Sequence, residues 1–306
     1  MDLLRRIVSL RGEFLLFALT PPRLASTAER AQEIADLTVE RLAPLDLDGL
    51  ILYDIDDEAD RNPEQRPFPF LPTMDPADYL DRHLRAWRTP VVVYRATAKY
   101  TERELRDWIA SQDPASRMAV FVGAPSRERR VATTLRRAQQ LRAEVDPALL
   151  LGAVAIPERH TRKGDEHLAL IAKQQAGCSF FVTQVVYDVN AAKNLVSDYA
   201  YACHDRGLAP LPIAFTFSVC GSIKTLEFLR WLGVDVPRWI ENDLRHSDDT
   251  LDTSLEHAEG AALELISFCR HLGVPFGINV ESVSIRRVEI EASVRLAKQL
   301  RSKLAR

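Results

Sequence analysis

The fold can be worked out from stretches such as residues 177–188, which read GCSFFVTQVVYD. A glycine ends the helix-like segment before it, an apolar run follows, and polar residues begin where that run stops. A short run rich in Phe and Val between such boundaries is typical of a buried strand. This stretch therefore predicts a strand over Phe180–Gln184 whose carboxyl end carries polar side chains.

The same pattern recurs along the chain, with a longer segment of helical period after each apolar run. The predicted strands are Phe14–Thr20, Gly49–Asp54, Pro90–Arg95, Met118–Gly123, Leu149–Ala155, Phe180–Gln184, Leu211–Phe215 and Phe276–Val280. Strands that alternate with helices predict an α/β fold with a parallel sheet. Repeated strand–helix units in 306 residues fit a (β/α)8 TIM barrel, which typically needs about 250 residues. We therefore expect one barrel domain over residues 1–306.

A doubly wound open sheet is the alternative fold. It carries a Gly-rich turn after its first strand, whereas this chain has Thr20-Pro21-Pro22-Arg23 there, so the alternative is disfavoured. Helix signals agree with the barrel. Ser26-Thr27 is placed to cap a helix over Ala28–Leu42, Asp75 precedes a helix that begins at Pro76, and Val236–Thr250 predicts a short extra helix.

A long segment rich in proline follows the second predicted strand, over Asp56–Met74. In a TIM barrel, the loops that follow the strands build the functional site, so this loop is expected on the catalytic face. Phe68 and Phe70 in the loop are candidates for a contact between subunits of a homo-oligomer.

The composition points to a small-molecule ligand. Lys and Arg number 40 against 43 Asp and Glu, so a net charge of -3 gives no reason to expect nucleic acid or a membrane as partner. No apolar run is long enough to cross a bilayer and no cleavage signature follows the first one, which predicts a cytoplasmic protein. Reduced thiols, with no disulfides and no zinc, are expected because CxxC spacing is missing among Cys178, Cys203, Cys220 and Cys269.

Polar residues stand at the carboxyl ends of several predicted strands, where they would converge on the mouth of the barrel. They lie at residues 53–56, 94–95, 157–160, 183–184, 187–188 and 279–281. Each also has an ordinary explanation: Asp54 could cap the long loop, Glu281 could pair with Arg286 or Arg287, and His160 could be solvated.

Gln184 is the most specific of these residues. A Gln that ends an apolar run offers an uncharged donor and acceptor, which suits the edge of a heterocycle. We expect Gln184 to bind the substrate together with Thr183 beside it and Tyr94 at the end of the third strand.

Several of these stretches resemble the methylenetetrahydrofolate reductase family. Residues 177–188 are similar to the family's GA-D-I-TQ-FFD signature, in which the Gln binds folate. Residues 17–23 (FALTPPR), 157–160 (PERH) and 236–239 (VPRW) resemble its F-E-F-F-P-P-R, Y-P-E-G-H and V-P-x-W motifs. The similarity runs from Phe14 to about Val283. It implies the same barrel, a C1-substituted tetrahydrofolate as substrate, NAD(P)H and FAD as redox partners, and one-carbon metabolism leading to methionine biosynthesis.

The chain departs from the family at its carboxylates. The family's strand-one Glu is Ala18 here, and its flavin-contacting R-G-D after strand four is replaced by Val122-Gly123-Ala124. The resemblance still implies cofactor binding by Glu158, His160, Asp165 and Lys173, and Arg127, Arg129 and Arg130 could hold a phosphate. Whether FAD is bound therefore stays open, and direct hydride transfer from NAD(P)H is the alternative.

Another carboxylate could replace the missing acid. Asp54 is the first candidate, because the second strand lies beside the first and a partly buried carboxyl can act as a general acid. Glu281, on the other neighbouring strand, is the second. The sequence thus predicts a divergent oxidoreductase. A folate-binding regulatory protein without activity and a methyltetrahydrofolate-dependent methyl-transfer protein remain alternatives.

Overall fold

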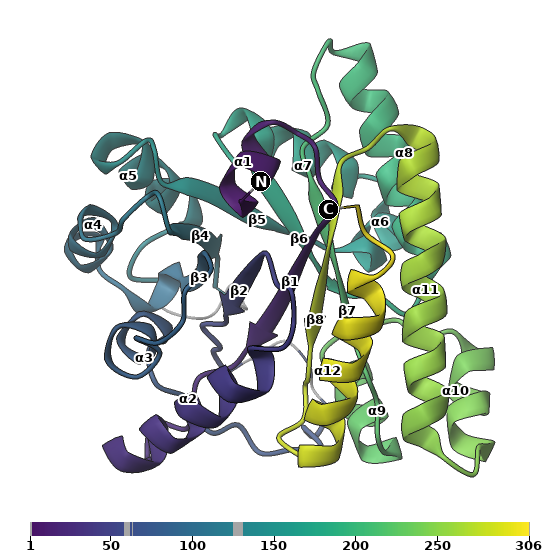
Figure 1. The fold of residues 1–306 in the computed structure, drawn as a ribbon. Coiled ribbons are helices and arrows are strands. Elements are labelled where there is room, and N and C mark those ends of the chain that lie inside the picture. The colour runs from purple at the N-terminus through teal and green to yellow at the C-terminus, as the bar shows by residue number, and fades with distance from the viewer. Residues whose placement is uncertain (1, 58–61, 63, 125–130, 306) are drawn as a thin grey trace.

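Eight parallel strands form a closed barrel in the order of the sequence (Figure 1). The computed structural model describes residues 2–57, 62, 64–124 and 131–305. The strands are β1 Phe14–Leu19, β2 Gly49–Leu52, β3 Val91–Ala96, β4 Arg117–Val122, β5 Leu150–Ala155, β6 Phe180–Val185, β7 Ile213–Ser218 and β8 Phe276–Glu281. The predicted (β/α)8 barrel is confirmed.

Helices surround the barrel and connect its strands. They are α1 Leu3–Val8, α2 Ala28–Leu42, α3 Pro76–Arg82, η2 Thr97–Lys99, α4 Glu102–Ala110, α5 Leu135–Val145, α6 Pro157–Lys163, α7 Glu166–Gln175, α8 Val189–Asp205, α9 Ile223–Trp231, α10 Arg238–His246, α11 Thr250–Leu272 and α12 Arg287–Arg301. The Thr27 hydroxyl caps α2 and the Asp75 carboxylate caps α3, as the sequence predicts.

The seventh strand is the one whose prediction needs the largest correction. The sequence places it over Leu211–Phe215, whereas β7 starts at Ile213 and continues to Ser218. It continues because it pairs with β8 along its whole length, with Ser218 opposite Glu281. This partner is remote in sequence, so the apolar run in β7 does not reveal where the strand ends.

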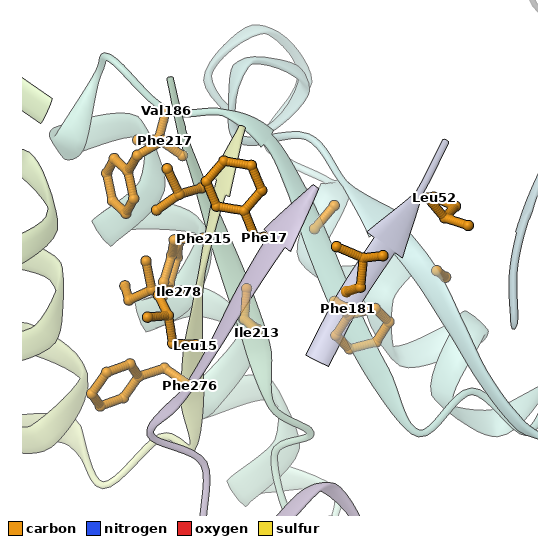
Figure 2. Close-up of a cluster of buried hydrophobic side chains, with 14 of the residues drawn as sticks. Leu15, Phe17, Leu52, Phe181, Val186, Ile213, Phe215, Phe217, Phe276 and Ile278 are labelled. Atoms are coloured by element: carbon orange, nitrogen blue, oxygen red, sulfur yellow. The ribbon is translucent and has the colours of Figure 1, made fainter. Parts of the chain in front are cut away.

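Two apolar layers hold the barrel together. The outward faces of the strands pack against the helices, and part of this layer is drawn in Figure 2. It includes Leu15, Phe17, Phe181, Phe215, Phe217, Phe276 and Ile278. A second layer fills the inside of the barrel. Burial of each such large side chain contributes about 1.5–3 kcal/mol.

The amino end of the barrel is closed by α1. Leu3 and Ile7 of this helix are buried against the inward-facing Phe14 and Leu16 of β1. The packing is so tight that a Cβ atom at Gly277 would lie 2.1 Å from the Phe14 ring. Among the described residues, the polar interior therefore opens toward the opposite, carboxyl end, at the bottom of the view in Figure 1.

The four cysteines Cys178, Cys203, Cys220 and Cys269 are buried and carry free thiols. Burial raises the pKa of each thiol, which keeps it protonated. Within the described part of the chain, no helix is both long and apolar enough to cross a membrane.

Candidate functional site

Polar side chains enter the barrel from β8 because its residues alternate between two faces. Ile278 and Val280 point outward into the layer beneath the helices. The residues between and after them, Asn279 and Glu281, therefore point inward, and both are buried. Tyr53, which directly follows β2, packs against the same interior.

These inward residues form one hydrogen-bonded chain. The Tyr53 hydroxyl donates to Glu281 Oε2 at 2.5 Å, and Asn279 Nδ2 donates to the Tyr53 oxygen at 3.1 Å. The same Asn279 amide also donates to Thr216 Oγ1 at 3.1 Å. Thr216 in turn donates to the Thr183 carbonyl at 2.8 Å. The chain links β8, the end of β2, β7 and β6, and it fixes the carboxyl group of Glu281.

The environment of Glu281 favours its protonated form. Burial raises the pKa of this carboxyl to about 7, against the opposing effect of the hydrogen bond from Tyr53. Burial and the nearby Glu281 also raise the pKa of Tyr53 and of Tyr94. The rings of these tyrosines meet edge to face with centroids 4.9 Å apart. Glu281 is thus a buried acid that can gain or lose a proton near neutral pH.

Glu281 also lies next to the position where the resemblance expects an acid. Ala18 of β1 pairs with Glu281 of β8 in the sheet, and it faces the barrel interior. A carboxylate side chain at position 18 would therefore lie close to that of Glu281. Two neighbouring carboxylates each make ionisation of the other less favourable. The acid on β8 is compatible with the small side chain on β1.

Asp54 is held away from this group. Its Oδ2 accepts hydrogen bonds from the Ala96 amide and the Tyr100 hydroxyl, both at 2.8 Å. Its Oδ1 pairs with the Lys99 ammonium, and only 1% of the side chain is exposed. The structure thus places Asp54 as the anchor of the η2 segment rather than beside Glu281.

The predicted substrate residues Gln184, Thr183 and Tyr94 make different contacts in the barrel. Gln184 is half-buried, and its Nε2 donates to the Leu232 carbonyl at the end of α9, at 3.0 Å. The Thr183 hydroxyl accepts from the Thr216 amide at 2.9 Å, so it supports the irregular pairing of β6 with β7. Tyr94 faces the interior next to Tyr53. The structure brings Tyr94 near Glu281, and it fixes Thr183 within the sheet.

The four predicted cofactor residues lie on α6 and α7 or at the start of α7. Lys173 donates to the Val154 carbonyl at 2.7 Å and to Glu166 at 3.2 Å. Glu158 is buried, which raises the pKa of its carboxyl to about 7. His160 is also buried and contacts Asp198, whereas Asp165 is exposed at the start of α7. Lys173 thus joins α7 to β5, and His160 joins α6 to α8.

The end of β4 lacks the flavin-contacting side chains that the resemblance expects. Val122 ends the strand, and Gly123 and Ala124 follow it, so these positions offer no charged or hydrogen-bonding side chain. Arg127, Arg129 and Arg130 lie outside the described residues. The side chains that the structure describes there therefore give no support for flavin binding.

The long loop after β2 reaches across to α9. Asn62 Nδ2 donates to the Trp231 carbonyl at 3.0 Å, and the Trp231 indole donates to the Glu64 carbonyl at 2.9 Å. A cavity of about 800 Å³ lies between this loop and the ends of α9 and α10. Arg230 and Arg245 line it together with acidic residues. It adjoins the turn at Leu232 that holds Gln184.

The chain was compared with known proteins. The family model of methylenetetrahydrofolate reductase matches residues 119–280. A solved structure of an uncharacterized protein from Clostridium thermocellum, described as binding two copies of 5-methyl-5,6,7,8-tetrahydrofolic acid, is 41% identical with a TM-score of 0.87. The match covers 98% of this chain and 99% of that one. No curated protein matches.

Other solved structures share only the barrel. A psychrophilic glycoside hydrolase family 10 endo-beta-1,4-xylanase is 10% identical with a TM-score of 0.53, and the match covers 99% of both chains. The EDTA monooxygenase from Chelativorans sp. BNC1 is 11% identical with a TM-score of 0.53, and the match covers 96% of this chain and 94% of that one. Identities this low concern the fold and not the function.

Proposed function

The chain belongs to the methylenetetrahydrofolate reductase family, and from this premise we propose that it binds a C1-substituted tetrahydrofolate at the carboxyl end of the barrel. The folate-binding relative from Clostridium thermocellum supports the ligand class, since the two chains match over nearly their full lengths. In this proposal Gln184 contacts the pterin edge with its amide, and its hydrogen bond to the Leu232 carbonyl orients the side chain. Tyr53 and Tyr94 supply aromatic surface beside Glu281.

The observation that carries the proposal is the buried Glu281 carboxyl. It lies in register with Ala18, where the family places its acid, and burial raises its pKa to about 7. A general acid is most effective when its pKa is near the working pH. Glu281 thus supplies from β8 the acid function that β1 lacks.

The reaction we propose is reduction of methylenetetrahydrofolate with NAD(P)H as the hydride donor. The protonated Glu281 gives its proton to the folate nitrogen that leaves the methylene carbon. NAD(P)H, when bound, would supply the hydride that this carbon accepts, so that the products are methyltetrahydrofolate and NAD(P)+. A proton from solvent restores the acid. No flavin takes part in this scheme, because Val122 and Ala124 replace the polar residues expected to contact it.

A second function is binding of methyltetrahydrofolate without redox chemistry, in a carrier, regulatory or methyl-transfer role. The ligand of the Clostridium thermocellum protein favours it, because methyltetrahydrofolate already carries the C1 unit in its reduced, methyl form. The two functions share the folate site but differ in their need for a nicotinamide and an acid.

Two measurements separate these functions. Purified protein is titrated with methyltetrahydrofolate by calorimetry, and NAD(P)H oxidation is followed after methylenetetrahydrofolate is added. Wild type is compared with Glu281→Gln and with Glu256→Gln, which changes an exposed glutamate as a control. The reductase proposal expects oxidation that Glu281→Gln lowers about 100-fold or more, with the control unchanged. Folate binding without oxidation leaves the carrier or methyl-transfer role, and no folate binding contradicts both.

A further inference from the structure

We propose that His160, His167 and Asp198 form a binding site for a divalent metal ion of the zinc class, in the layer of helices outside the barrel. This site goes beyond the folate function and shares none of the residues proposed for folate binding. The spacing of the cysteines predicts no zinc site, and none of the four cysteines belongs to this group. Two imidazoles and a carboxylate are nevertheless common ligands of Zn²⁺.

The turn between α6 and α7 sets the two histidines side by side. Gly164 ends α6 with a φ of 72°, a left-handed conformation that glycine adopts readily, and the chain reverses into α7. His160 in the middle of α6 and His167 near the start of α7 then meet edge to face, with ring centroids 5.2 Å apart.

Asp198 completes the group from the neighbouring helix α8. His160 Nε2 and Asp198 Oδ2 are 3.0 Å apart. One ligand atom from each of the three residues lies within 4.8 Å of the other two. Neighbouring ligand atoms around tetrahedral zinc are about 3.4 Å apart when each bond is about 2.0–2.1 Å. A small movement of His167 or Asp198 would therefore suffice to bring all three onto one ion.

The burial of these residues supports a ligand between them. His160 is only 5% exposed. Its Nδ1 and the Nδ1 of His167 are buried, and neither has a hydrogen-bond partner among the described residues. Each buried polar atom without a partner costs about 1–3 kcal/mol. Because His160 Nε2 is the nitrogen that faces Asp198, a bound ion would provide a partner for His167 Nδ1, which the surrounding helices do not.

The accessible side of the group suits a fourth ligand. The Asp198 side chain is 55% exposed, so solvent reaches the carboxylate while the His160 ring stays buried. Three protein ligands with an open fourth position are typical of zinc sites that keep a bound water. The carboxylate also offsets part of the charge of the ion. Without a metal, the same group would be an ordinary His–Asp hydrogen bond between helices.

Metal titration of the full chain tests the proposal. The protein is treated with a chelator and dialysed, then titrated with Zn²⁺ by calorimetry and with Co²⁺ by visible absorption. We expect one ion per chain and the visible bands of a four-coordinate cobalt site. His167→Gln and Asp198→Asn should each weaken Zn²⁺ binding at least about tenfold, since even residues that only support metal ligands have effects of this size.

His204→Gln is the matched control, because His204 lies on the same helix as Asp198 but is exposed and outside the group. Both variants of the site change residues with solvent access, so they should fold, and their circular dichroism shows whether they do. Absence of Zn²⁺ binding by wild type overturns the proposal, as does binding that His167→Gln and Asp198→Asn leave unchanged. Folate titration of the same proteins is independent, so failure of the metal site leaves the folate proposal intact.

Discussion

Replacing Glu281 by Gln should make the protein more stable at high pH. The variant keeps the shape of the side chain and can still accept a hydrogen bond from Tyr53, but it cannot ionise. In wild type, burial raises the pKa of this carboxyl from 4.5 to about 7. At about 1.36 kcal/mol per pKa step, this difference corresponds to about 3 kcal/mol between the folded and unfolded states.

The direction of the effect follows from proton binding. Below about pH 4.5 the carboxyl is protonated in both the folded and the unfolded state, so it does not change the free energy of unfolding with pH. Between 4.5 and about 7 the unfolded chain releases the proton while the folded chain keeps it, so the free energy of unfolding falls as pH rises. Above about pH 7 the full loss of about 3 kcal/mol is present. Gln at this position avoids that loss.

Urea unfolding at pH 5 and pH 8, followed by tryptophan fluorescence, measures the effect. The stability of Glu281→Gln relative to wild type should rise by about 2–3 kcal/mol between the two pH values. Glu158, whose pKa is also raised, is present in both proteins and cancels. The exposed control Glu256→Gln should show no such change. If the stability difference is the same at both pH values, Glu281 does not have a raised pKa, and its proposed role as an acid at neutral pH fails.

Three other substitutions follow from the same geometry. Tyr53→Phe removes the hydrogen bond that lowers the pKa of Glu281, so the pH profile of turnover should move to higher pH; a profile identical to that of wild type would contradict the proposed pairing. Asp54→Ala leaves Lys99 without its buried partner and should destabilise the protein by about 3 kcal/mol in urea unfolding, whereas a large loss of turnover with unchanged stability would restore Asp54 as the acid. Gln184→Ala should weaken methyltetrahydrofolate binding about tenfold in calorimetry through loss of one or two hydrogen bonds, and unchanged affinity would place the pterin elsewhere.

The fold was predictable because it depends on local patterns. Seven of the strands begin within one residue of their predicted starts, since each apolar run is bounded by residues that end a strand or a helix. The extra helix α10 falls inside the predicted Val236–Thr250. The helix α1 was missed, because six residues at the start of the chain carry little periodicity. This helix closes the amino end of the barrel, and that role is apparent only in the assembled fold.

The site was less predictable because its residues meet across long distances in sequence. Tyr53, Asn279 and Glu281 could each be named as polar residues at strand ends, but not the hydrogen bonds that join them. The sequence favours Asp54 over Glu281, because nothing in it indicates that Lys99 and Tyr100 bind the Asp54 carboxylate. Register between strands decides which carboxylate faces the interior, and that register is fixed only when the barrel closes.

The pairing of β1 with β8 therefore also governs when the site comes into being. Glu281 is hydrogen-bonded to Tyr53, a residue 228 positions earlier in the chain. The raised pKa of Glu281 therefore cannot arise while synthesis has reached only β7. A ribosome-bound chain that ends before β8 would have an open edge on β1 and β7 and no organised acid. Glu281 thus obtains its buried, hydrogen-bonded environment only at the step in which the barrel closes.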